Sequence, residues 1–380
     1  MNILITGAKG FIGQNVVAQL NSIRDGKAQN APIGSGIEIM AFDVDTDFAR
    51  LADYCARADF ILHLAGVNRP PNPEAFMAGN CGFTQTLLDT LSRQKNTCPI
   101  MLASSTQAAL DNPYGASKRA GEALVREYGI NTGAKTLIYR FPNVFGKWCR
   151  PNYNSAVATF CHNTANGLPI QVNDPSVIMR LVYIDDVVLE LTRALAGKEN
   201  RTGDFCEVPV VLTGTLGFIA DAIASFPTVR AALGVPDMNH PLIKALYATY
   251  LSYVPLDKLS ITAKMNVDDR GSFTELVKTA DRGQCSVNVI KPGITKGNHW
   301  HHTKNERFIV VQGQGMIRFR KVYTDAVYEY PVSGDSIEII DIPPGVTHNI
   351  ENVGTGDMVT VMWCNECFDK DNPDTFFEPV

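Results

Sequence analysis

Residues 3–13 read ILITGAKGFIG and decide the fold of the N-terminal half of the chain. The apolar run 3–5 predicts a buried strand, and glycines then recur at every third position before a helix-like segment over residues 15–20. Glycine permits a tight turn, and a helix N-terminus favours the charge of a pyrophosphate. The stretch therefore predicts a dinucleotide-binding turn, with an ordinary strand-to-helix turn as the alternative. The residues expected to bind the cofactor are Thr6, Gly7, Lys9, Gly10, Phe11, Ile12 and Gly13.

The pattern of apolar runs divides the 380 residues into two domains. Over residues 1–250, short apolar runs alternate with helix-like segments, which predicts an α/β Rossmann-type fold with a doubly wound parallel sheet. Over residues 260–380 closely spaced β runs are punctuated by glycine and proline, which predicts an all-β antiparallel barrel. The segment 246–264 between them is rich in aromatic and apolar residues, and we expect it to pack.

Composition narrows the partners and the compartment. The net charge is −5 and no basic run is present, which argues against nucleic acid as a partner. We expect no membrane partner, because no window approaches the ~18 apolar residues of a membrane span. The N-terminus lacks the pattern of a secretory signal, and the nine cysteines form no repeated framework. A cytoplasmic protein with reduced thiols is therefore expected.

A second motif, near the C-terminus, has the spacing of a metal site. Its residues are His299, His301 and Glu306, and His348 follows a Pro-Pro-Gly turn. Because side chains alternate along a strand, His299 and His301 point the same way, and the other two arrive from neighbouring strands. Three imidazoles and a carboxylate suit one divalent metal ion, with Zn²⁺ expected first. The alternative is a polar barrel interior without metal.

Tyr114 and Lys118 form the pattern of a proton donor. They lie four residues apart and so share one helix face, downstream of a strand that ends in Ser104 and Ser105. A lysine ammonium lowers the pKa of a nearby phenol, which can then protonate a carbonyl oxygen that a neighbouring hydroxyl also polarises. We expect Ser105 to supply this hydroxyl, with Ser104 and Thr106 as alternatives.

Asp43 follows the second predicted strand of the N-terminal domain. A carboxylate there would accept a hydrogen bond from a ribose hydroxyl and repel a 2′-phosphate, which on charge alone favours NADH over NADPH. Lys9 or Arg69 could still bind that phosphate, so NADPH stays open.

Residues 1–245 resemble the short-chain dehydrogenase/reductase superfamily in its extended, nucleotide-sugar branch. Besides the motifs above, the resemblance lies in segments 63–66, 140–146 and 180–186. It implies that Leu64, Ala65 and Gly66 bind the cofactor and that Asn143 and Arg180 face a nucleotide-sugar. The chain departs from the family in one respect, since only eight residues separate Ser105 from Tyr114.

The C-terminal motifs resemble the cupin superfamily, and residues 268–275, DDRGSFTE, are similar to a segment of the dTDP-4-keto-sugar 3,5-epimerases. This resemblance implies a substrate-binding role for Arg270. Over its full length the chain resembles the CapF-type capsular polysaccharide enzymes. That resemblance implies C3 epimerisation of UDP-2-acetamido-2,6-dideoxy-4-hexulose, a UDP-linked 4-keto-6-deoxy-N-acetylhexosamine, in the cupin. It further implies C4 reduction with NADPH in the reductase domain, a UDP-2-acetamido-2,6-dideoxy-L-talose product, and a homodimer.

The base of the epimerisation is left open by the motifs. His299 stands where the epimerases carry their basic histidine, yet a metal-bound nitrogen cannot also accept a proton. His302 and Lys296 are the candidate bases. Two other functions remain in view. In one, only the reductase is active and the cupin is a metal-stabilised dimerisation module. In the other, the chain is a redox-sensing protein that holds NADP without turnover.

Overall fold

The computed structural model describes residues 1–28, 30–70 and 72–380. They form two compact units, one of Met1–Ala224 with Asn239–Pro255 and the other of Ser225–Met238 with Leu256–Val380. Helix α8 (Leu216–Ala231) contributes residues to both units. Within these described ranges, no helix has the length and apolar character needed to cross a membrane.

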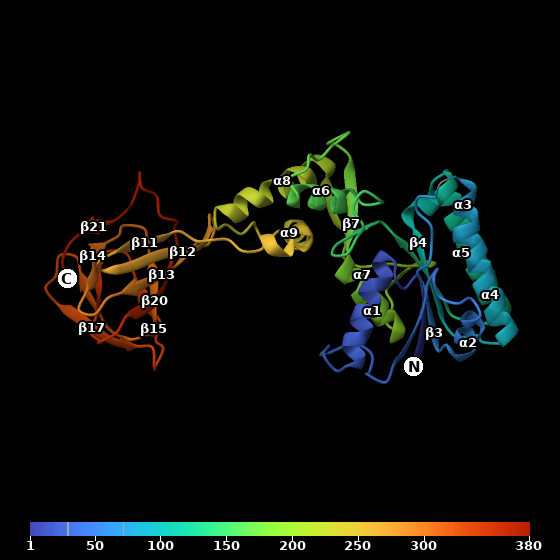
Figure 1. Ribbon diagram of the computed structural model, residues 1–380, viewed down its shortest axis with the longest axis horizontal. Helices are drawn as coiled ribbons and strands as arrows, with labels where there is room; N and C mark the ends of the chain where they lie inside the picture. The colour runs from blue at the N-terminus through green and yellow to red at the C-terminus, as the bar shows by residue number, and fades with distance from the viewer. Residues whose placement is uncertain (29, 71) are drawn as a thin grey trace. The chain divides into compact units, whose positions relative to one another are not determined.

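A largely parallel sheet forms the centre of the first unit, in the order β2-β1-β3-β4-β5-β9-β8 (Figure 1). The chain winds outward from β1 in both directions, so the carboxyl ends of β1 and β3 lie at the point where a doubly wound sheet receives its ligand. The strands are β1 (Asn2–Thr6), β2 (Glu38–Phe42), β3 (Phe60–His63), β4 (Ile100–Ser105), β5 (Thr136–Phe141), β8 (Arg201–Thr202) and β9 (Phe205–Cys206).

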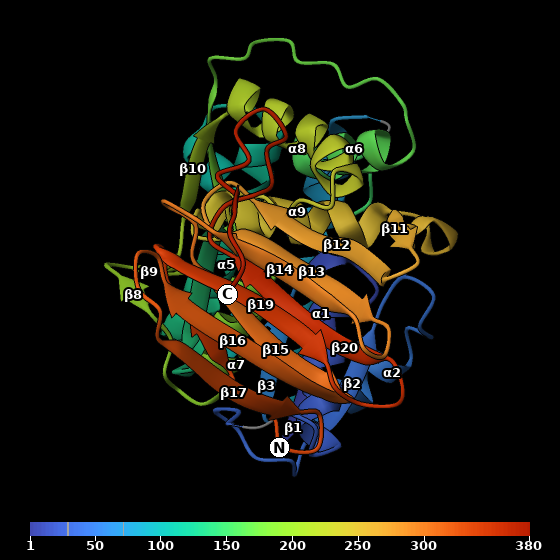
Figure 2. The same ribbon diagram turned by 90° about the vertical axis from the view of Figure 1, so that its left-hand side faces the viewer.

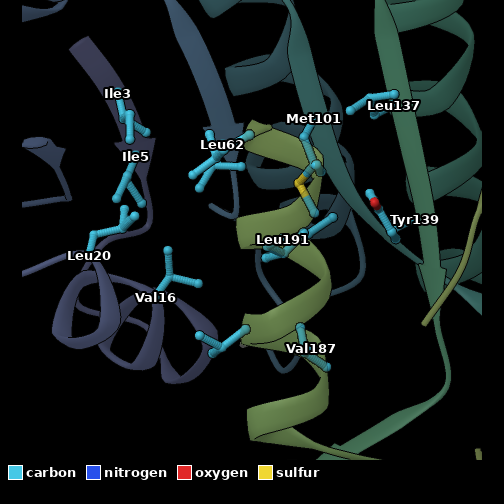
Figure 3. Packing of buried hydrophobic residues seen from close by; sticks show 14 of the residues in the cluster. Ile3, Ile5, Val16, Leu20, Leu62, Met101, Leu137, Tyr139, Val187 and Leu191 are labelled. Carbon is cyan, nitrogen blue, oxygen red and sulfur yellow. The ribbon is translucent and has the colours of Figure 1, made fainter. Parts of the chain in front are cut away.

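Helices cover both faces of this sheet because its strands are apolar on both sides. Ile3 and Ile5 of β1 belong to a buried cluster with residues of α1 (Phe11–Arg24) and α7 (Ile184–Leu195), as Figure 3 shows. Leu4, between them, belongs to the cluster on the opposite face. That cluster is completed by α2 (Arg50–Arg57), α4 (Phe83–Gln94) and α5 (Pro113–Thr132).

A small three-stranded sheet and two helices complete the first unit. The sheet runs in the order β10-β7-β6, and the elements are β6 (Asn143–Phe145), β7 (Ile178–Tyr183), β10 (Leu212–Thr215), α6 (Ala156–Ala165) and α9 (Pro241–Tyr253). Leu246 and Tyr250 of α9 are buried, which confirms the expected packing for the first part of segment 246–264. The second part is different, since Leu256 is 87% exposed.

The second unit consists of two antiparallel sheets, whose strands are visible in Figure 2. Apolar side chains from both sheets, such as Phe308 and Ile350, form its core. The six-stranded sheet contains β11 (Met265–Asp268), β12 (Gly271–Thr279), β13 (Gly283–Ile290), β20 (Met358–Cys364), β15 (Glu306–Gln312) and β18 (Ile340–Ile342). The five-stranded sheet contains β17 (Val327–Ser333), β16 (Gln314–Lys321), β19 (Val346–Asn352), β14 (Thr295–Trp300) and β21 (Phe376–Phe377). The predicted fold class, a Rossmann-type α/β unit followed by an all-β unit, is confirmed.

Gly271, at the start of β12, allows two strands of the second unit to approach closely. Its φ is +132°, and a Cβ there would lie 1.9 Å from the main-chain oxygen of Val289. We predict that Gly271→Ala lowers the free energy of unfolding by at least about 1–3 kcal/mol, the usual cost of such backbone strain. Gly356→Ala is the control, because a Cβ at Gly356 meets nothing within 4 Å. Urea unfolding followed by tryptophan fluorescence measures both, and equal stabilities would contradict the prediction.

Candidate functional site

The glycine turn after β1 leaves no room for side chains. Gly7 has a φ of +71°, and a Cβ there would lie 2.7 Å from the main chain of Ala65, just beyond β3. A Cβ on Gly13 would lie 2.1 Å from the carbonyl oxygen of Gly7. Helix α1 therefore begins directly behind the turn, and its N-terminus is where the predicted pyrophosphate would bind.

Asp43 lies beside this turn at the end of β2. One of its carboxylate oxygens accepts the main-chain N–H of Lys9 at 2.7 Å. The side chain of Lys9 forms an exposed ion pair with Asp45. Asp43 is therefore adjacent to the predicted cofactor site. The negative charge of Asp43, which favours NADH, and the positive charge of Lys9, which could bind the 2′-phosphate of NADPH, are both found there.

The active-site helix α5 begins at a well-formed cap. Asn112 accepts a hydrogen bond from the N–H of Gly115 at 2.7 Å, and Pro113 occupies the first helical position. The first turn presents Tyr114, and the side chain of Ser105 at the end of β4 lies near enough to lower the pKa of its phenol. The short connection between these two residues is a 3₁₀ turn, η2 (Thr106–Ala109), packed so closely that a Cβ on Gly115 would lie 2.3 Å from the oxygen of Gln107. This packing brings Ser105 to Tyr114 despite the missing insertion.

Ser104 has a different environment from Ser105. It is buried, and its hydroxyl donates to the carboxylate of Glu122, which also binds Arg140 through two hydrogen bonds of 2.9 and 2.6 Å. Of the two serines, only Ser105 influences the pKa of the Tyr114 phenol, and the Ser104 hydroxyl is already bonded to Glu122, which favours Ser105 over Ser104. Glu122 lies one helical turn beyond Lys118 on the same face of α5, a spacing from which its role could have been inferred.

Lys118 is a buried cation close to the Tyr114 ring. Its Nζ donates to the main-chain oxygen of Ala103 at 3.1 Å and lies 5.8 Å from the centre of that ring. Burial lowers the pKa of Lys118 to about 8, against the opposing effect of the Glu122 carboxylate. Burial also raises the pKa of Tyr114, and the Ser105 hydrogen bond only partly offsets this. The lowered phenol pKa expected from the sequence is therefore not found, and Tyr114 stays protonated as a proton donor requires.

Residues 64–66 form the opposite wall of this site. A Cβ on Gly66 would lie 3.0 Å from the Lys118 Nζ and 2.9 Å from Oδ1 of Asn80, so only glycine fits beside the lysine. The Asn80 side chain also accepts the N–H of Val67 at 2.8 Å. Leu64 and Ala65 thus lie in the strand end between the glycine turn and the Tyr114–Lys118 pair.

The two predicted sugar-binding residues of the first unit lie on neighbouring strands. Asn143 of β6 and Arg180 of β7 are both exposed, and the Asn143 amide donates to the main-chain oxygen of Arg180 at 3.4 Å. They are therefore close together and accessible to a ligand.

In the second unit, the structure brings the four predicted metal ligands together. His299, His301, Glu306 and His348 each offer a ligand atom, and all four atoms lie within 4.8 Å of one another. His299 and His348 face each other across β14 and β19, where a bulge interrupts the register between Gly297 and His299. The sequence motif gave no sign of this bulge.

The buried polar atoms of this cluster fit a cation. Nε2 of His301 and Nε2 of His348 lie 3.4 and 3.1 Å from Oε2 of Glu306, yet none of the three atoms has a well-formed hydrogen bond. Burial alone would raise the pKa of Glu306, but the two imidazoles outweigh it and lower that pKa to about 2. Burial lowers the pKa of His299 to about 4. A carboxylate with neutral imidazoles is the donor set of a divalent metal.

A cavity of about 510 Å³ opens onto the cluster and is lined by His299, His301 and Glu306. The buried Lys304 also lines it, although the sequence motif did not single out this residue. The remaining lining residues are Leu233, Lys264, Asn266, Phe273, Glu275, Gln284, Cys364, Glu366, Phe368 and Thr375.

The two candidate bases lie outside the lining of that cavity. Lys296 lines a second cavity of about 520 Å³, which also contains Arg270 and shares Asn266 and Phe273 with the first. The exposed ring of His302 contacts the rings of Trp300 and Phe376, with centres 4.5 and 4.8 Å away.

Two family models match the chain. Residues 3–206 match the NAD dependent epimerase/dehydratase family, and residues 266–376 match the polysaccharide biosynthesis C-terminal domain. A curated relative, the UDP-2-acetamido-2,6-beta-L-arabino-hexul-4-ose reductase of Pseudomonas aeruginosa, is 43% identical over 99% of this chain and 98% of its own length. The first match supports a nicotinamide cofactor.

Solved structures resemble either the whole chain or its first unit. The crystal structure of the capsular polysaccharide assembling protein CapF from Staphylococcus aureus is 51% identical, covers 100% of both chains and superposes with a TM-score of 0.92. A UDP-glucuronic acid 4-epimerase from Bacillus cereus is 20% identical, covers 67% of this chain and 98% of its own, and has a TM-score of 0.53, a likeness of fold alone. The chain therefore belongs to the family of CapF-type capsular polysaccharide enzymes, in which an NAD-dependent epimerase/dehydratase domain precedes a polysaccharide biosynthesis C-terminal domain.

Proposed function

We propose that the chain converts a UDP-linked 4-keto-6-deoxy-N-acetylhexosamine into a precursor of capsular polysaccharide by reducing its C4 ketone in the first unit. The observation that carries this proposal is the pairing of Tyr114 with the buried Lys118, whose Nζ lies 5.8 Å from the centre of the Tyr114 ring, with Ser105 close enough to influence the phenol pKa. The Pseudomonas relative, named as a reductase of a UDP-linked hexul-4-ose, supports the substrate class. The proposed product is UDP-2-acetamido-2,6-dideoxy-L-talose.

In the proposed reduction, the bound nicotinamide supplies a hydride to C4 of the sugar. Tyr114 donates its phenolic proton to the C4 oxygen, and the Ser105 hydroxyl polarises that oxygen before the transfer. The Lys118 ammonium stabilises the phenolate that is left behind. A redox sensor without turnover has no use for a proton donor held in this way.

We expect NADPH as the reductant, as the family resemblance implies. Asp43 favours NADH on charge grounds, whereas Lys9, whose N–H binds Asp43, offers a cation to a 2′-phosphate. The rates with the two coenzymes decide between them, and a preference for NADH would overturn this expectation.

The second unit is proposed to epimerise C3 before the reduction. A proton on C3 becomes acidic only if the enolate oxygen at C4 is stabilised, and a divalent metal bound by His299, His301, Glu306 and His348 would act there as a Lewis acid. Hydride delivery at C4 then removes the ketone and makes the inversion permanent. Asn143 and Arg180 in the first unit, and Arg270 in the second, are the proposed substrate-binding residues.

Lys296 and His302 remain the proposed bases, and Lys304 joins them because it lines the cavity of the metal cluster. The alternative function is a reductase whose second unit is a metal-stabilised module of a homodimer.

Tyr114→Phe separates the two reactions. We predict that this variant loses at least about 100-fold in reduction, since a positioned general acid contributes 10²–10⁴-fold. It should keep the exchange of the C3 proton with D₂O, followed by NMR without coenzyme. Loss of both reactions would contradict two independent sites. Lys296→Met, His302→Ala and Lys304→Met in the same assay identify the base as the variant that loses exchange but keeps its metal.

The pH dependence of reduction reports on Lys118. Because its pKa is lowered to about 8, the ammonium is present below that pH and is lost as the pH rises through it. We predict that kcat/KM for reduction is constant below pH 8 and falls above it. Glu122→Gln removes the charge that raises this pKa, so the fall should begin at lower pH. Ser104→Ala removes a hydrogen bond to Glu122 but no charge, and serves as the control. Unchanged profiles in all three proteins would contradict the assignment.

The metal site predicts a clear contrast between two histidines of the second unit, His348 inside the cluster and His302 outside it. We expect about one equivalent of divalent metal, with zinc foremost, in the purified chain, measured by elemental analysis. His348→Ala should lose the metal, because the substitution removes one of the four ligands. His302→Ala should retain the metal, since that ring contacts Trp300 and Phe376 instead of the cluster. Equal metal contents in the two variants would refute this ligand set.

A further inference from the structure

The last strand of the chain pairs with β14, the strand that carries the proposed metal ligand His299. Strand β21 pairs with β14, so that Phe377 lies opposite His299 and Phe376 opposite Trp300. The next residue, Glu378, donates its N–H to the oxygen of Asn298 at 2.9 Å. We call residues 373–378 the C-terminal strap. It pairs with the edge of β14 that faces away from β19.

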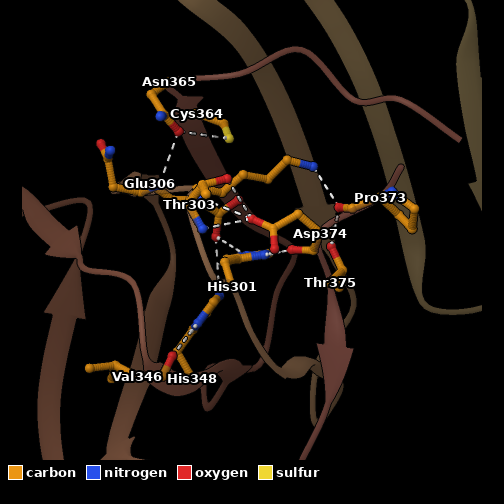
Figure 4. Close-up of polar contacts among 12 residues, drawn as sticks. His301, Thr303, Glu306, Val346, His348, Cys364, Asn365, Pro373, Asp374 and Thr375 are labelled. Carbon is orange, nitrogen blue, oxygen red and sulfur yellow. Dashed lines mark hydrogen bonds and ion pairs between the residues drawn. The ribbon is translucent and has the colours of Figure 1, made fainter. Parts of the chain in front are cut away.

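Asp374 in this strap binds the turn that follows β14 (Figure 4). Its carboxylate accepts three successive main-chain N–H groups, those of His302, Thr303 and Lys304, at 3.0, 2.9 and 3.1 Å. The Thr303 hydroxyl donates to the same carboxylate at 3.0 Å. Asp374 thus accepts hydrogen bonds from three main-chain N–H groups of the turn that connects the ligands His301 and Glu306.

Asp374 also contacts a metal ligand directly through its main chain. Its carbonyl oxygen lies 2.6 Å from Nδ1 of His301, which must carry the proton of that hydrogen bond. In the neutral ring the lone pair is then on the other nitrogen, Nε2, and this is the buried atom 3.4 Å from Glu306. A hydrogen bond at one ring nitrogen sets which nitrogen of a histidine can bind a metal.

Further contacts hold the strap around Asp374. Lys304 donates from Nζ to the oxygen of Pro373 at 2.6 Å, and the one proton of the Thr303 hydroxyl is shared between the carboxylates of Asp374 and Glu366, at 3.0 and 2.9 Å. Asp374 itself has a φ of +40°, a left-handed conformation that a non-glycine residue adopts only when its surroundings impose it. The local backbone is therefore held in a strained form that aims one carbonyl at His301 and one carboxylate at the turn.

We propose that Asp374 is a positioning residue for the metal centre, which fixes the tautomer of His301 and the path of residues 302–304 between two ligands. The inference rests on the proposed metal site and deepens it. The ligand motif ends at Glu306 and His348, whereas this residue comes from the far end of the chain, 73 positions after His301.

The test compares Asp374→Asn with Asp371→Asn, an exposed carboxylate of the same segment. In Asp374→Asn an NH₂ group, which donates hydrogen bonds, replaces one of the two carboxylate oxygens that accept the main-chain N–H groups of the turn. We expect Asp374→Asn to weaken Zn²⁺ binding about 10–100-fold, the usual effect of disturbing the groups that orient a metal-bound histidine, because the turn 302–304 no longer holds the Asp374 carbonyl against His301. Competition with a chromophoric chelator measures the affinity, and the control should match the wild-type chain. Thr303→Val removes a single hydrogen bond to Asp374 and should weaken binding less.

A second readout separates positioning from general destabilisation. At saturating Co²⁺, the visible absorption spectrum should change in Asp374→Asn, because the orientation of His301 in the coordination sphere changes, and should stay unchanged in Asp371→Asn. If Asp374→Asn kept both the wild-type affinity and the wild-type spectrum, the proposed role of Asp374 would be overturned, while the metal centre would stand. A wild-type chain that binds neither metal would overturn the metal centre and this inference together. In every variant, the rate of sugar reduction in the first unit is the control that this unit is folded.

Discussion

Three buried polar atoms without well-formed hydrogen bonds, on His301, Glu306 and His348, are the constraint on which the account of the second unit depends. Leaving a buried polar group unsatisfied costs about 1–3 kcal/mol, and more if it is charged. A core that assembles such atoms within 4.8 Å of one another needs a compensating interaction, and a divalent cation supplies one. The strands, the bulge in β14 and the C-terminal strap all serve to hold these atoms in place.

In the first unit the buried charge is a cation, the ammonium group of Lys118. Lys118 has a main-chain oxygen at 3.1 Å, and the carboxylate of Glu122 opposes the loss of its proton. Burial still lowers its pKa to about 8, so the ammonium persists near neutral pH and titrates just above it. Arg140 and Ser104 share Glu122, which gives that carboxylate a fixed position. The result is a phenol that remains protonated next to a cation able to stabilise its conjugate base.

Features that depend on residues close together in the sequence could be predicted, whereas features that depend on distant residues could not. The glycine turn, the Tyr114–Lys118 pair and the metal motif are local patterns, and periodicity reveals the strands that carry them. The choice between Ser104 and Ser105 needs the surroundings of each side chain, because both lie at one strand end, yet Ser104 is bonded to Glu122 and only Ser105 influences the pKa of Tyr114. The contact from Asp374 to His301 joins positions 73 residues apart, which no local pattern encodes.

The division of labour between the two units is the central claim, and isotope incorporation during turnover tests it most directly. The chain is incubated in D₂O with a UDP-linked 4-keto-6-deoxy-N-acetylhexosamine and NADPH, and C3 of the reduced product is examined by NMR. The account predicts deuterium at C3 with inverted configuration and hydrogen from the coenzyme at C4. A reduced product with unlabelled C3 of the original configuration would contradict it.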